Sequence, residues 1–393
     1  MTISNHGYNV EFITTDADLY SAIEYLKGCS VIAFDLEFDN NRYQYGFHLC
    51  LVQVCSDSRC FVIDPFSITD KAIAALFEIF SDTDILKIIH AGGEDLRLLQ
   101  ILDCKPKNLF DTEVAARLLG YDKFSLGNMI LQKFEIELDK KLQNANWTKR
   151  PITTEQISYA ANDVVYLLEL KTMLEQELEN TPQKIWFAEE MTVMENTFFV
   201  IEQKANFIKK ADRDDFSEYD LFVLESIFRF RESVAKSFNK PVYQVFNDDF
   251  VREIVRNPAI IDRWQYQKGI LHYVKNSAFQ QQIDGIYQTA LDEAEAKNLS
   301  KTGSGKQRMS DDEWQAIMKT RAERQRTKDR VFMPIQKQIA EKYGSLLAPI
   351  ILSGRIVDEI VAGETKITDL KHNYKRVIIT EAAADLGIDL STF

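Results

Sequence analysis

Two acidic side chains inside an apolar strand constrain the fold of this chain more than any other feature of its sequence. The stretch VIAFDLEFDN, residues 31–40, has the bulky apolar character of a β-strand. Because strand side chains alternate between two faces, Asp35 and Glu37 lie on the same face. Burying two like charges without a partner would cost several kcal/mol. We therefore expect a positively charged group between these carboxylates.

Length and composition predict a folded protein of two or three domains. The 393 residues are 45% hydrophobic, which is enough for a sizeable core, and their net charge is -13. This acidity argues against a protein that coats nucleic acid through bulk charge. It is compatible with an enzyme that grips a phosphate backbone through local basic patches.

The sequence indicates a cytoplasmic protein with no evident obligate protein partner. No apolar run reaches the ~18 residues that a membrane span needs, and the N-terminus lacks the features of a secretory signal. The cysteines follow no metal-binding or redox spacing, so we expect reduced, packed thiols. They are Cys29, Cys50, Cys55, Cys60 and Cys104.

The pattern of the chain changes near residue 177, from mixed strand and helix segments to helices alone. Before this point, short β-branched segments such as HLCLVQVC and CFVIDP predict an α/β domain around a central sheet. The polar, basic stretch KNLSKTGSGKQR is typical of a linker. The predicted divisions are an α/β domain over residues 1–178, a connecting helical segment over 179–212, a helical domain over 213–295, a linker over 296–309 and a last helical domain over 310–393.

Two further segments carry carboxylates at the ends of predicted elements. In KIIHAGGEDLRLLQ a strand ends, two glycines turn, and Asp95 opens a helix, where an acidic residue also suits the helix dipole. In RPITTEQISYAANDVVYLLEL, Thr153 and Gln156 form a capping box that predicts the start of a helix. Tyr159 and Asp163 then lie on one face of it. Taken alone, these would be read as a core aromatic residue and a solvated charge.

Taken together, the four carboxylates predict a site for two divalent cations. Mg²⁺ takes hard oxygen ligands, and two such ions about 3.5–4 Å apart can clamp the attacking and leaving oxygens of a phosphodiester. The ligands in this interpretation are Asp35, Glu37, Asp95 and Asp163.

The motifs FDLEF, HAGGEDLRLL and YAANDVVYLL resemble the three exonuclease motifs of the DEDD superfamily. With HLCLVQVC, VIDPF, FDTEVAARLLGY and LDKKLQNANWTKRPIT between them, residues 10–178 resemble the ribonuclease D family. The resemblance implies a ribonuclease-H-like (DnaQ-like) α/β exonuclease domain with a mixed central sheet. It also implies that the four carboxylates bind two Mg²⁺ or Mn²⁺ ions. Tyr159 would orient the attacking water, and none of the five histidines lies in the third motif, so the chain is of the tyrosine (DEDDy) type.

Cationic residues near these motifs are candidates for RNA contacts. The run before the third motif suits a phosphate clamp and a stacked base as well as it suits a solvated loop around a buried tryptophan. Its members are Lys140, Lys141, Trp147, Lys149 and Arg150. Arg42 lies in FDNNRYQYGF, which departs from the family pattern, and would replace an arginine that commonly follows the first motif. Asp111 is either a second carboxylate layer or a helix N-cap, and we expect Gln53 to hydrogen-bond locally.

The helical part resembles HRDC modules, which often bind nucleic acid. The segment LFVLESIFRFRESVAKSFNKPVYQVFNDDFVREIVRNP carries this likeness, with Arg229 and Arg231 flanking Phe230 as candidate RNA contacts. Residues 310–393 resemble a second, diverged copy. An ordinary bundle that packs on the nuclease is the alternative for both.

The sequence therefore predicts a 3′→5′ exoribonuclease that releases nucleoside 5′-monophosphates from RNA with a free single-stranded 3′ end. Precursor tRNA and other structured RNAs are the substrates that the resemblance implies. One alternative is a DNA 3′→5′ exonuclease acting on single-stranded DNA, because the same carboxylates serve both reactions. The other is a nucleic-acid-binding protein with an inactive nuclease core, which an incomplete carboxylate set would have favoured.

Overall fold

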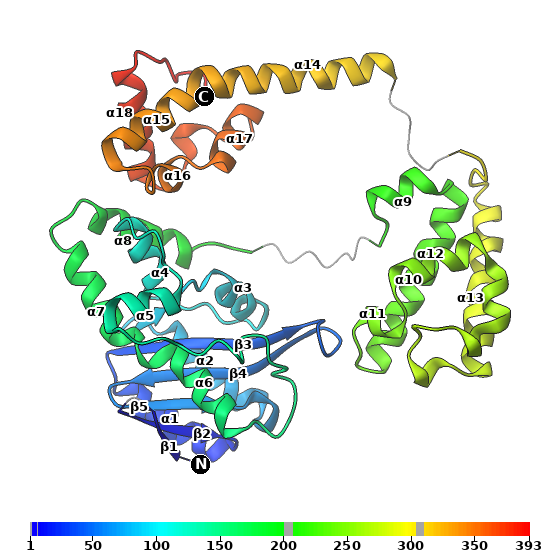
Figure 1. The fold of residues 1–393 in the computed structure, drawn as a ribbon, viewed down its shortest axis with the longest axis horizontal. Coiled ribbons are helices and arrows are strands. Elements are labelled where there is room, and N and C mark those ends of the chain that lie inside the picture. The colour runs from blue at the N-terminus through cyan, green and yellow to red at the C-terminus, as the bar shows by residue number, and fades with distance from the viewer. Residues whose placement is uncertain (1, 6, 200–206, 304–309) are drawn as a thin grey trace.

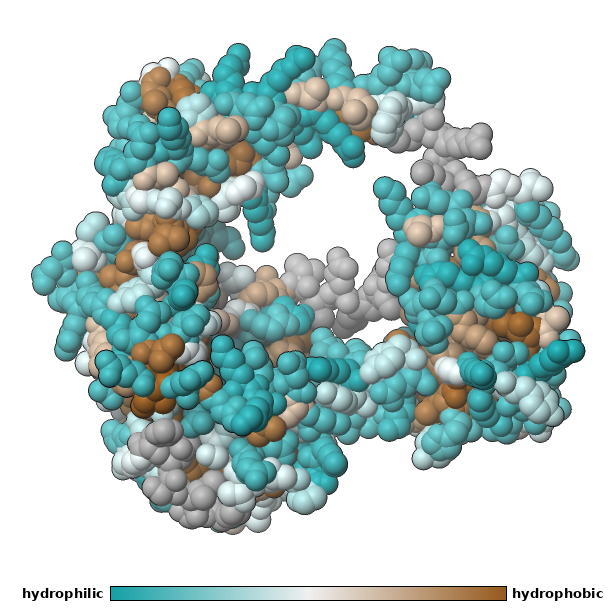
Figure 2. All heavy atoms as spheres, in the orientation of Figure 1, coloured by the Kyte–Doolittle hydropathy of each residue, from teal (hydrophilic) through white to brown (hydrophobic). Residues whose placement is uncertain are grey.

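An α/β domain and two helical units follow one another along the chain (Figure 1). The computed structural model describes residues 2–5, 7–199, 207–303 and 310–393. We call residues 207–303 the first helical unit and residues 310–393 the second. Figure 2 shows the three parts arranged around an open centre. Among the described residues, no helix has the length and apolar character needed to cross a bilayer.

The α/β domain is built on a mixed sheet in the order β1-β2-β5-β4-β3-β6-β7. The strands are β1 (Thr2–Asn5), β2 (Tyr8–Ile13), β3 (Val31–Asn40), β4 (Phe47–Ser56), β5 (Arg59–Ile63), β6 (Leu86–Ile89) and β7 (Leu109–Asp111). The β2–β5, β3–β6 and β6–β7 pairs are parallel, and the others are antiparallel. This confirms the mixed central sheet that the sequence predicts.

Helices cover both faces of this sheet. They are α1 (Asp16–Lys27), α2 (Asp70–Ser81), α3 (Gly93–Ile101), α4 (Thr112–Leu118), α5 (Leu126–Phe134), α6 (Thr154–Val165), α7 (Leu167–Leu178) and α8 (Gln183–Glu195), with a 3₁₀ turn η1 (Pro65–Ser67). Phe34 of β3 stacks on Phe80 of α2, with 4.4 Å between ring centroids. Helix α6 packs across β3, β4 and β5. Since Asp35 alternates with Phe34, its side chain points to the face opposite α2.

The pairing of β3 with β4 is interrupted beside the first motif. Asp35 lies opposite Gln53 and Glu37 opposite Leu51, but Phe38 lies opposite Leu49. Cys50 is therefore an extra residue in β4, which makes a β-bulge next to Glu37. Such bulges redirect strands and side chains and are common beside functional sites.

The cysteine expectation is wrong for one pair. Cys55 and Cys60 lie directly opposite each other in the β4–β5 hairpin and are joined by a disulfide. Cys29, Cys50 and Cys104 are free thiols, as expected. Sequence spacing could not reveal the pair because the contact is set by hairpin register.

The first helical unit has a hydrophobic core of its own. Trp264 is fully buried against the rings of Phe246, Phe250 and Phe279. Its elements are α9 (Lys210–Asp215), α10 (Glu218–Ser237), α11 (Val242–Val245), α12 (Asp248–Arg256), η2 (Pro258–Tyr266), η3 (His272–Val274) and α13 (Ser277–Ala296).

The second helical unit shares one continuous core with the α/β domain. Trp186 of α8 stacks on Tyr374 of α18 with 5.1 Å between ring centroids. The elements of this unit are α14 (Asp311–Thr327), the π-helical turn η4 (Lys328–Phe332), α15 (Met333–Tyr343), α16 (Ala348–Ile351), α17 (Gly354–Ala362), η5 (Ile367–Asp369) and α18 (Asn373–Asp385). The two helical units are thus joined to the α/β domain by different means.

Polar contacts connect the first helical unit to the tip of the β3–β4 hairpin. The Tyr45 hydroxyl donates to Glu232 Oε1 at 2.8 Å, and the Tyr243 hydroxyl donates to the Arg42 carbonyl at 2.7 Å. The hairpin tip belongs to the segment that departs from the family pattern. This segment therefore forms a link between the motif-bearing strand and the helices.

Candidate metal-dependent active site

Three of the four predicted carboxylates come together on one side of the sheet. Asp35 and Glu37 on β3 and Asp163 on α6 each offer a carboxylate oxygen, and these oxygens lie within 4.8 Å of one another. Asp35 and Glu37 are both paired with β4, and β6 pairs with β3 just before them at residues 31–33, so the two side chains are held on a sheet backbone. Hard oxygen ligands at this spacing suit a divalent cation.

Helix α6 reaches the sheet because its start and its inner face are well specified. Thr153 and Gln156 form the predicted capping box, with both hydrogen bonds present. Ala160 and Ala161 are fully buried, so the helix lies close to the strands. Asp163 then projects toward the carboxylates of β3.

Asp95 lies on α3, which follows β6, the strand next to β3. It is outside the group of three, but burial and the charge of Asp35 raise its pKa well above the usual range. A Cβ at Gly92, in the turn before α3, would come within 2.3 Å of Ile89 Cδ1, so a larger residue there would displace the buried Ile89 side chain. Asp95 therefore lies in the negative electrostatic field of the three clustered carboxylates, although a different helix carries it.

Asp111 fixes this turn as well as capping α4. Its carboxylate accepts hydrogen bonds from the amides of Ala91 at 3.0 Å and Gly92 at 2.9 Å, and also from Glu113 at 2.8 Å. The N-cap alternative is thus confirmed. Its hydrogen bonds to the turn at Gly92 are a second role. No local pattern could indicate this role, because Asp111 is about twenty positions from Ala91 and Gly92.

Burial and mutual repulsion raise the pKa values of the clustered acids. Burial, then the charges of Asp35, Asp163 and Asp95, raise the pKa of Glu37 to about 10. Burial raises the pKa of Asp163 to about 7, and burial followed by the charge of Asp163 raises that of Asp35 well above normal. The chain by itself therefore disfavours full ionisation of this cluster. Divalent cations would relieve the repulsion, so the residues fit the two-ion site that the sequence predicts.

Tyr159 lies beside the carboxylates and stays protonated at neutral pH. Burial, followed by the charge of Asp163, raises the pKa of its phenol to about 12. Tyr159, Asp163, Lys140 and Gln143 line a hollow of about 160 Å³ next to the cluster. The phenol thus offers a hydrogen bond, not a base, to whatever occupies this hollow.

The prediction that Trp147 stacks on a base needs correction. Its side chain is only 4% exposed and packs against Tyr159, with 6.0 Å between ring centroids. The ring is therefore part of the wall behind Tyr159, which agrees with the buried-tryptophan alternative.

Arg150 also has a structural role where an RNA contact was predicted. Its guanidinium binds both oxygens of Asp64 at 2.7 Å and donates to the carbonyls of Trp147 at 2.7 Å and Cys50 at 2.9 Å. The Cys50 carbonyl belongs to the bulged residue of β4. Arg150 thus joins the loop before α6 to the bulge opposite Glu37, and its donors are already engaged.

The remaining cations differ in how free they are. Arg231 is buried and paired with Asp248 at 2.8 Å, so its prediction as an RNA contact is corrected. Arg229 pairs with Glu225, and Lys141 pairs with Asp139 at 3.1 Å. The prediction of an RNA contact stays open for Arg229 and Lys141, which are exposed despite these pairs, and for three more exposed cations. They are Arg42, Lys140 and Lys149.

Gln53 is a site residue whose environment the sequence did not reveal. It lies opposite Asp35 and is fully buried, yet neither polar atom of its amide has a hydrogen-bond partner. The expected local hydrogen bond is therefore wrong. A buried amide without a partner costs about 1–3 kcal/mol. Its position beside Asp35 indicates that this cost is tolerated at the site.

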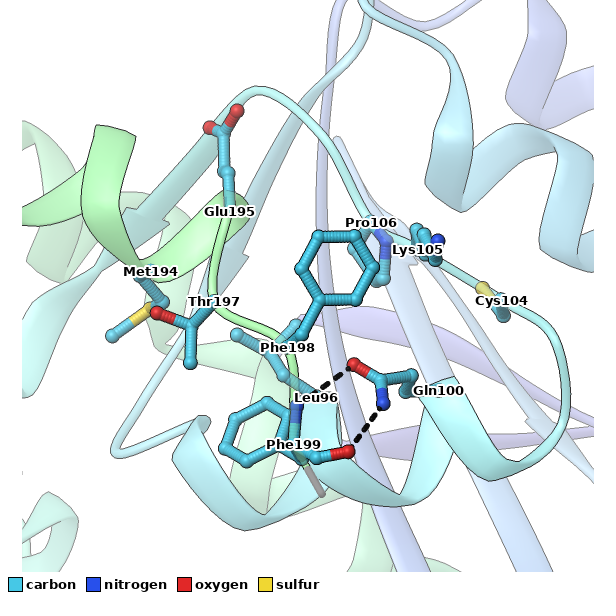
Figure 3. Close-up of a pocket in the computed structure, with 10 residues that line it drawn as sticks. All are labelled: Leu96, Gln100, Cys104, Lys105, Pro106, Met194, Glu195, Thr197, Phe198 and Phe199. Atoms are coloured by element: carbon cyan, nitrogen blue, oxygen red, sulfur yellow. Dashed lines mark hydrogen bonds between the residues drawn. The ribbon is translucent and has the colours of Figure 1, made fainter. Parts of the chain in front are cut away.

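A second hollow lies on the other side of α3, where the chain leaves the α/β domain. Figure 3 shows Gln100 making two hydrogen bonds to the backbone of Phe199. Gln100 Nε2 donates to the Phe199 carbonyl at 2.8 Å, and the Phe199 amide donates to Gln100 Oε1 at 3.2 Å. This hollow is lined by apolar side chains such as Leu96 and Met194. It holds the departing chain and contains none of the clustered carboxylates.

Comparison with known proteins identifies the family. Residues 10–179 match the 3′-5′ exonuclease family. A ribonuclease D from Nitrobacter hamburgensis is 30% identical over 260 residues, which are 65% of this chain and 67% of that protein. The chain belongs to the ribonuclease D family. A ribonuclease D from Desulfotalea psychrophila is 32% identical over 247 residues, which are 62% of this chain but only 65% of that protein, just under two thirds of its length.

Solved structures agree with the ribonuclease D fold over most of the chain. Escherichia coli RNase D has a TM-score of 0.65 at 21% identity, covering 96% of this chain and 98% of that one. The catalytic core of RRP6 from Trypanosoma brucei has a TM-score of 0.63 at 24% identity, covering 75% and 82%. The predicted fold class, an exonuclease domain followed by helical domains, is therefore confirmed.

Proposed function

We propose that this ribonuclease D family member is a 3′→5′ exoribonuclease that shortens RNA by hydrolysis. The observation that carries the proposal is the convergence of Asp35, Glu37 and Asp163 within 4.8 Å in a chain of this family. Hydrolysis would release nucleoside 5′-monophosphates, because cleavage leaves the phosphate on the departing nucleotide.

The three clustered carboxylates, with Asp95, would hold two divalent cations, Mg²⁺ or Mn²⁺. Bound there, the cations would activate water and neutralise the charge that develops on the leaving 3′ oxygen. The protein residues do the positioning. Tyr159 holds the attacking water by a hydrogen bond from its protonated phenol, and the hollow beside it receives the terminal nucleotide.

A free single-stranded 3′ end fits this arrangement, since the terminal phosphodiester must reach partly buried carboxylates. Structured RNA such as precursor tRNA is the proposed natural substrate. The Escherichia coli relative is described as an exoribonuclease involved in structured RNA processing, which supports this assignment. We further propose that both helical units are HRDC-type modules and that the protein acts in the cytoplasm.

Matched RNA and DNA oligonucleotides with 5′ labels test the proposal. We expect a ladder that shortens from the 3′ end of RNA with Mg²⁺ or Mn²⁺, and no cleavage with EDTA or in a folded Asp35→Asn variant. Cleavage of DNA alone would identify a DNA exonuclease. Binding without cleavage of either strand would identify a nucleic-acid-binding protein with an inactive core.

A further inference from the structure

Helix α14 projects from the second helical unit with no buried residue along its whole length. It is anchored at its C-terminal end, where Val331 and Phe332 of η4 enter the core and Lys328 pairs with Asp358 of α17. Figure 1 shows the helix running along the upper edge of the molecule from this unit toward the side of the first helical unit. Packing within the chain therefore does not explain its composition.

One face of α14 combines exposed apolar side chains with arginines. Trp314, Ile317, Met318, Arg321 and Arg324 follow the spacing of a single helix face. We call these five residues the Trp314 face. Trp314 is 50% exposed, Ile317 36% and Met318 45%. In Figure 2, pale and brown atoms lie along this helix among hydrophilic ones.

The second half of α14 and the η4 turn after it carry a charge opposite to that of the whole chain, whereas the acids of the first turn leave α14 itself with four cations and four acids. Six cations and two acids lie between Lys319 and Arg330, a net charge of four positive, whereas the chain as a whole has a net charge of -13. Most helical arginines elsewhere are paired within a turn, as Arg229 is with Glu225 and Arg355 with Glu359. Arg321 and Arg324 have no acidic partner within the part of the chain that the structure describes.

An unpaired stretch of RNA complements both properties of this face. Bases stack on aromatic and apolar side chains, and arginines bind the intervening phosphates. A protein partner would match the apolar residues, but the cations would then need a separate acidic partner. RNA satisfies the whole face with one polyanion.

We propose that the Trp314 face binds an unpaired segment of the same RNA, upstream of the 3′ end that the α/β domain shortens. The inference rests on the proposed exoribonuclease function and extends it by naming a substrate-binding element. RNA long enough to reach α14 gains affinity from it, whereas RNA that fills only the carboxylate site does not.

Two paired substitutions in the full-length protein test the proposal. Arg321→Ala with Arg324→Ala removes the cations of the Trp314 face. Lys319→Ala with Arg326→Ala removes the same charge from the opposite face of the helix and is the control. The substrates are an unstructured RNA of about 30 nucleotides, which exceeds the ~4–16 nucleotides of one single-strand site, and a tetranucleotide.

We expect the Arg321/Arg324 variant to raise KM for the long RNA about tenfold with kcat unchanged, and the control pair to raise it less than about twofold. Trp314→Ala should act as the arginine pair does. KM for the tetranucleotide should not change in any variant. Circular dichroism should be unchanged, because all the substituted side chains are exposed.

Equal rises in KM for the two pairs would overturn the proposal, because general charge would then explain binding. So would an unchanged KM for the long RNA in all variants. If the wild type is a dimer and Trp314→Ala makes it monomeric while KM for RNA is unchanged, the Trp314 face binds a second copy of the chain, and the proposal is overturned. If the wild type shortens neither RNA, the proposed function fails. Fluorescence anisotropy of the same RNAs then decides separately whether the face binds.

Discussion

The carboxylate cluster concentrates negative charge where the fold provides little water to stabilise it. Burial raises the pKa of Asp163 from 3.8 to about 7. An acid whose pKa is raised by folding destabilises the folded state once it ionises. That cost is absent below its ordinary pKa, grows as the pH rises, and is complete above the folded value. Without cations, the protein should therefore lose stability between these two pH values.

Asp163→Asn should make the metal-free protein more stable at pH 8, because the amide cannot ionise. We expect its Tm in EDTA to exceed that of the wild type by several degrees at pH 8 and by little at pH 4, since about 1 kcal/mol shifts Tm by ~2–4 °C in domains of 150–250 residues. Activity should fall at least about a hundredfold, as it does when residues that merely support metal ligands are lost. Differential scanning calorimetry measures the Tm at both pH values, with the exposed Asp122→Asn as control. A lower Tm than the wild type at pH 8 would contradict the argument.

Tyr159→Phe should slow hydrolysis without weakening RNA binding. The change removes one hydroxyl and keeps the ring that packs against Trp147. We expect the single-turnover rate to fall about a hundredfold, the lower range for loss of a positioned proton-handling group. Rapid-quench kinetics and RNA affinity should be measured together, with Tyr20→Phe on the exposed side of α1 as control. Weakened binding at an unchanged rate would assign Tyr159 to substrate binding.

At the scale of elements, the loop before α6 depends on one buried ion pair. Asp64 is almost fully buried, and Arg150 spans from it to the bulge in β4. The same loop carries Trp147, which supports Tyr159 from behind. The pair therefore links the shape of the first-motif strand to the position of the third-motif tyrosine.

Arg150→Ala should lower both stability and kcat, because it leaves the Asp64 carboxylate without its partner. Breaking a buried pair typically costs about 3–5 kcal/mol, and the partial exposure of Arg150 places the loss at the lower end. The control is Arg59→Ala, which breaks the more exposed pair with Glu11 at the same 2.7 Å distance. It should cost less than about 1 kcal/mol and leave kcat unchanged. Urea unfolding and steady-state kinetics distinguish the two, and equal kcat losses would refute the link.

At the scale of the whole molecule, the second helical unit is fixed to the α/β domain by a buried polar cluster beside the Trp186–Tyr374 stack. Glu190 of α8 accepts from the Tyr374 hydroxyl at 2.6 Å, pairs with Lys375 at 2.8 Å and lies 3.0 Å from His372. Burial alone would raise the pKa of Glu190, but the hydrogen bond from His372 and the charge of Lys375 outweigh it and lower the pKa to about 2. The ionised carboxylate therefore holds the two parts together.

Glu190→Gln should destabilise the protein by about 3 kcal/mol, because Lys375 is left buried without its counter-charge. A double variant with Lys375→Met should recover part of that loss. In the wild type, the contribution is present above the ordinary pKa of 4.5 and is lost as the pH falls toward about 2. Urea unfolding of the wild type, of Glu190→Gln, of Lys375→Met and of the double variant measures the coupling energy between the two residues. A double variant whose loss equals the sum of the single losses would show that the two residues act independently.

Sequence reasoning succeeded where local rules decide the structure. The strand that carries Asp35 and Glu37, the capping box at Thr153 and the α/β-to-helical division follow from alternation, caps and composition. It failed where distant segments meet. Arg150 binds Asp64, which is 86 positions away, and Tyr374 binds Glu190, which is 184 positions away. Neither pair can be recognised from a local sequence pattern. The shared core of the second helical unit agrees with the alternative of a bundle that packs on the nuclease, although no local pattern identifies the faces that meet.

The hydrogen bonds from Gln100 to the chain that leaves the α/β domain have a consequence for how the sequence can vary during evolution. Both of its hydrogen bonds go to main-chain atoms of residue 199, so they are indifferent to the side chain there. Position 199 can therefore change among apolar residues that keep its amide in place and pack against the core as Phe199 does, whereas the two bonds need the side-chain amide at position 100. Related chains could therefore share this attachment with a different apolar residue at position 199.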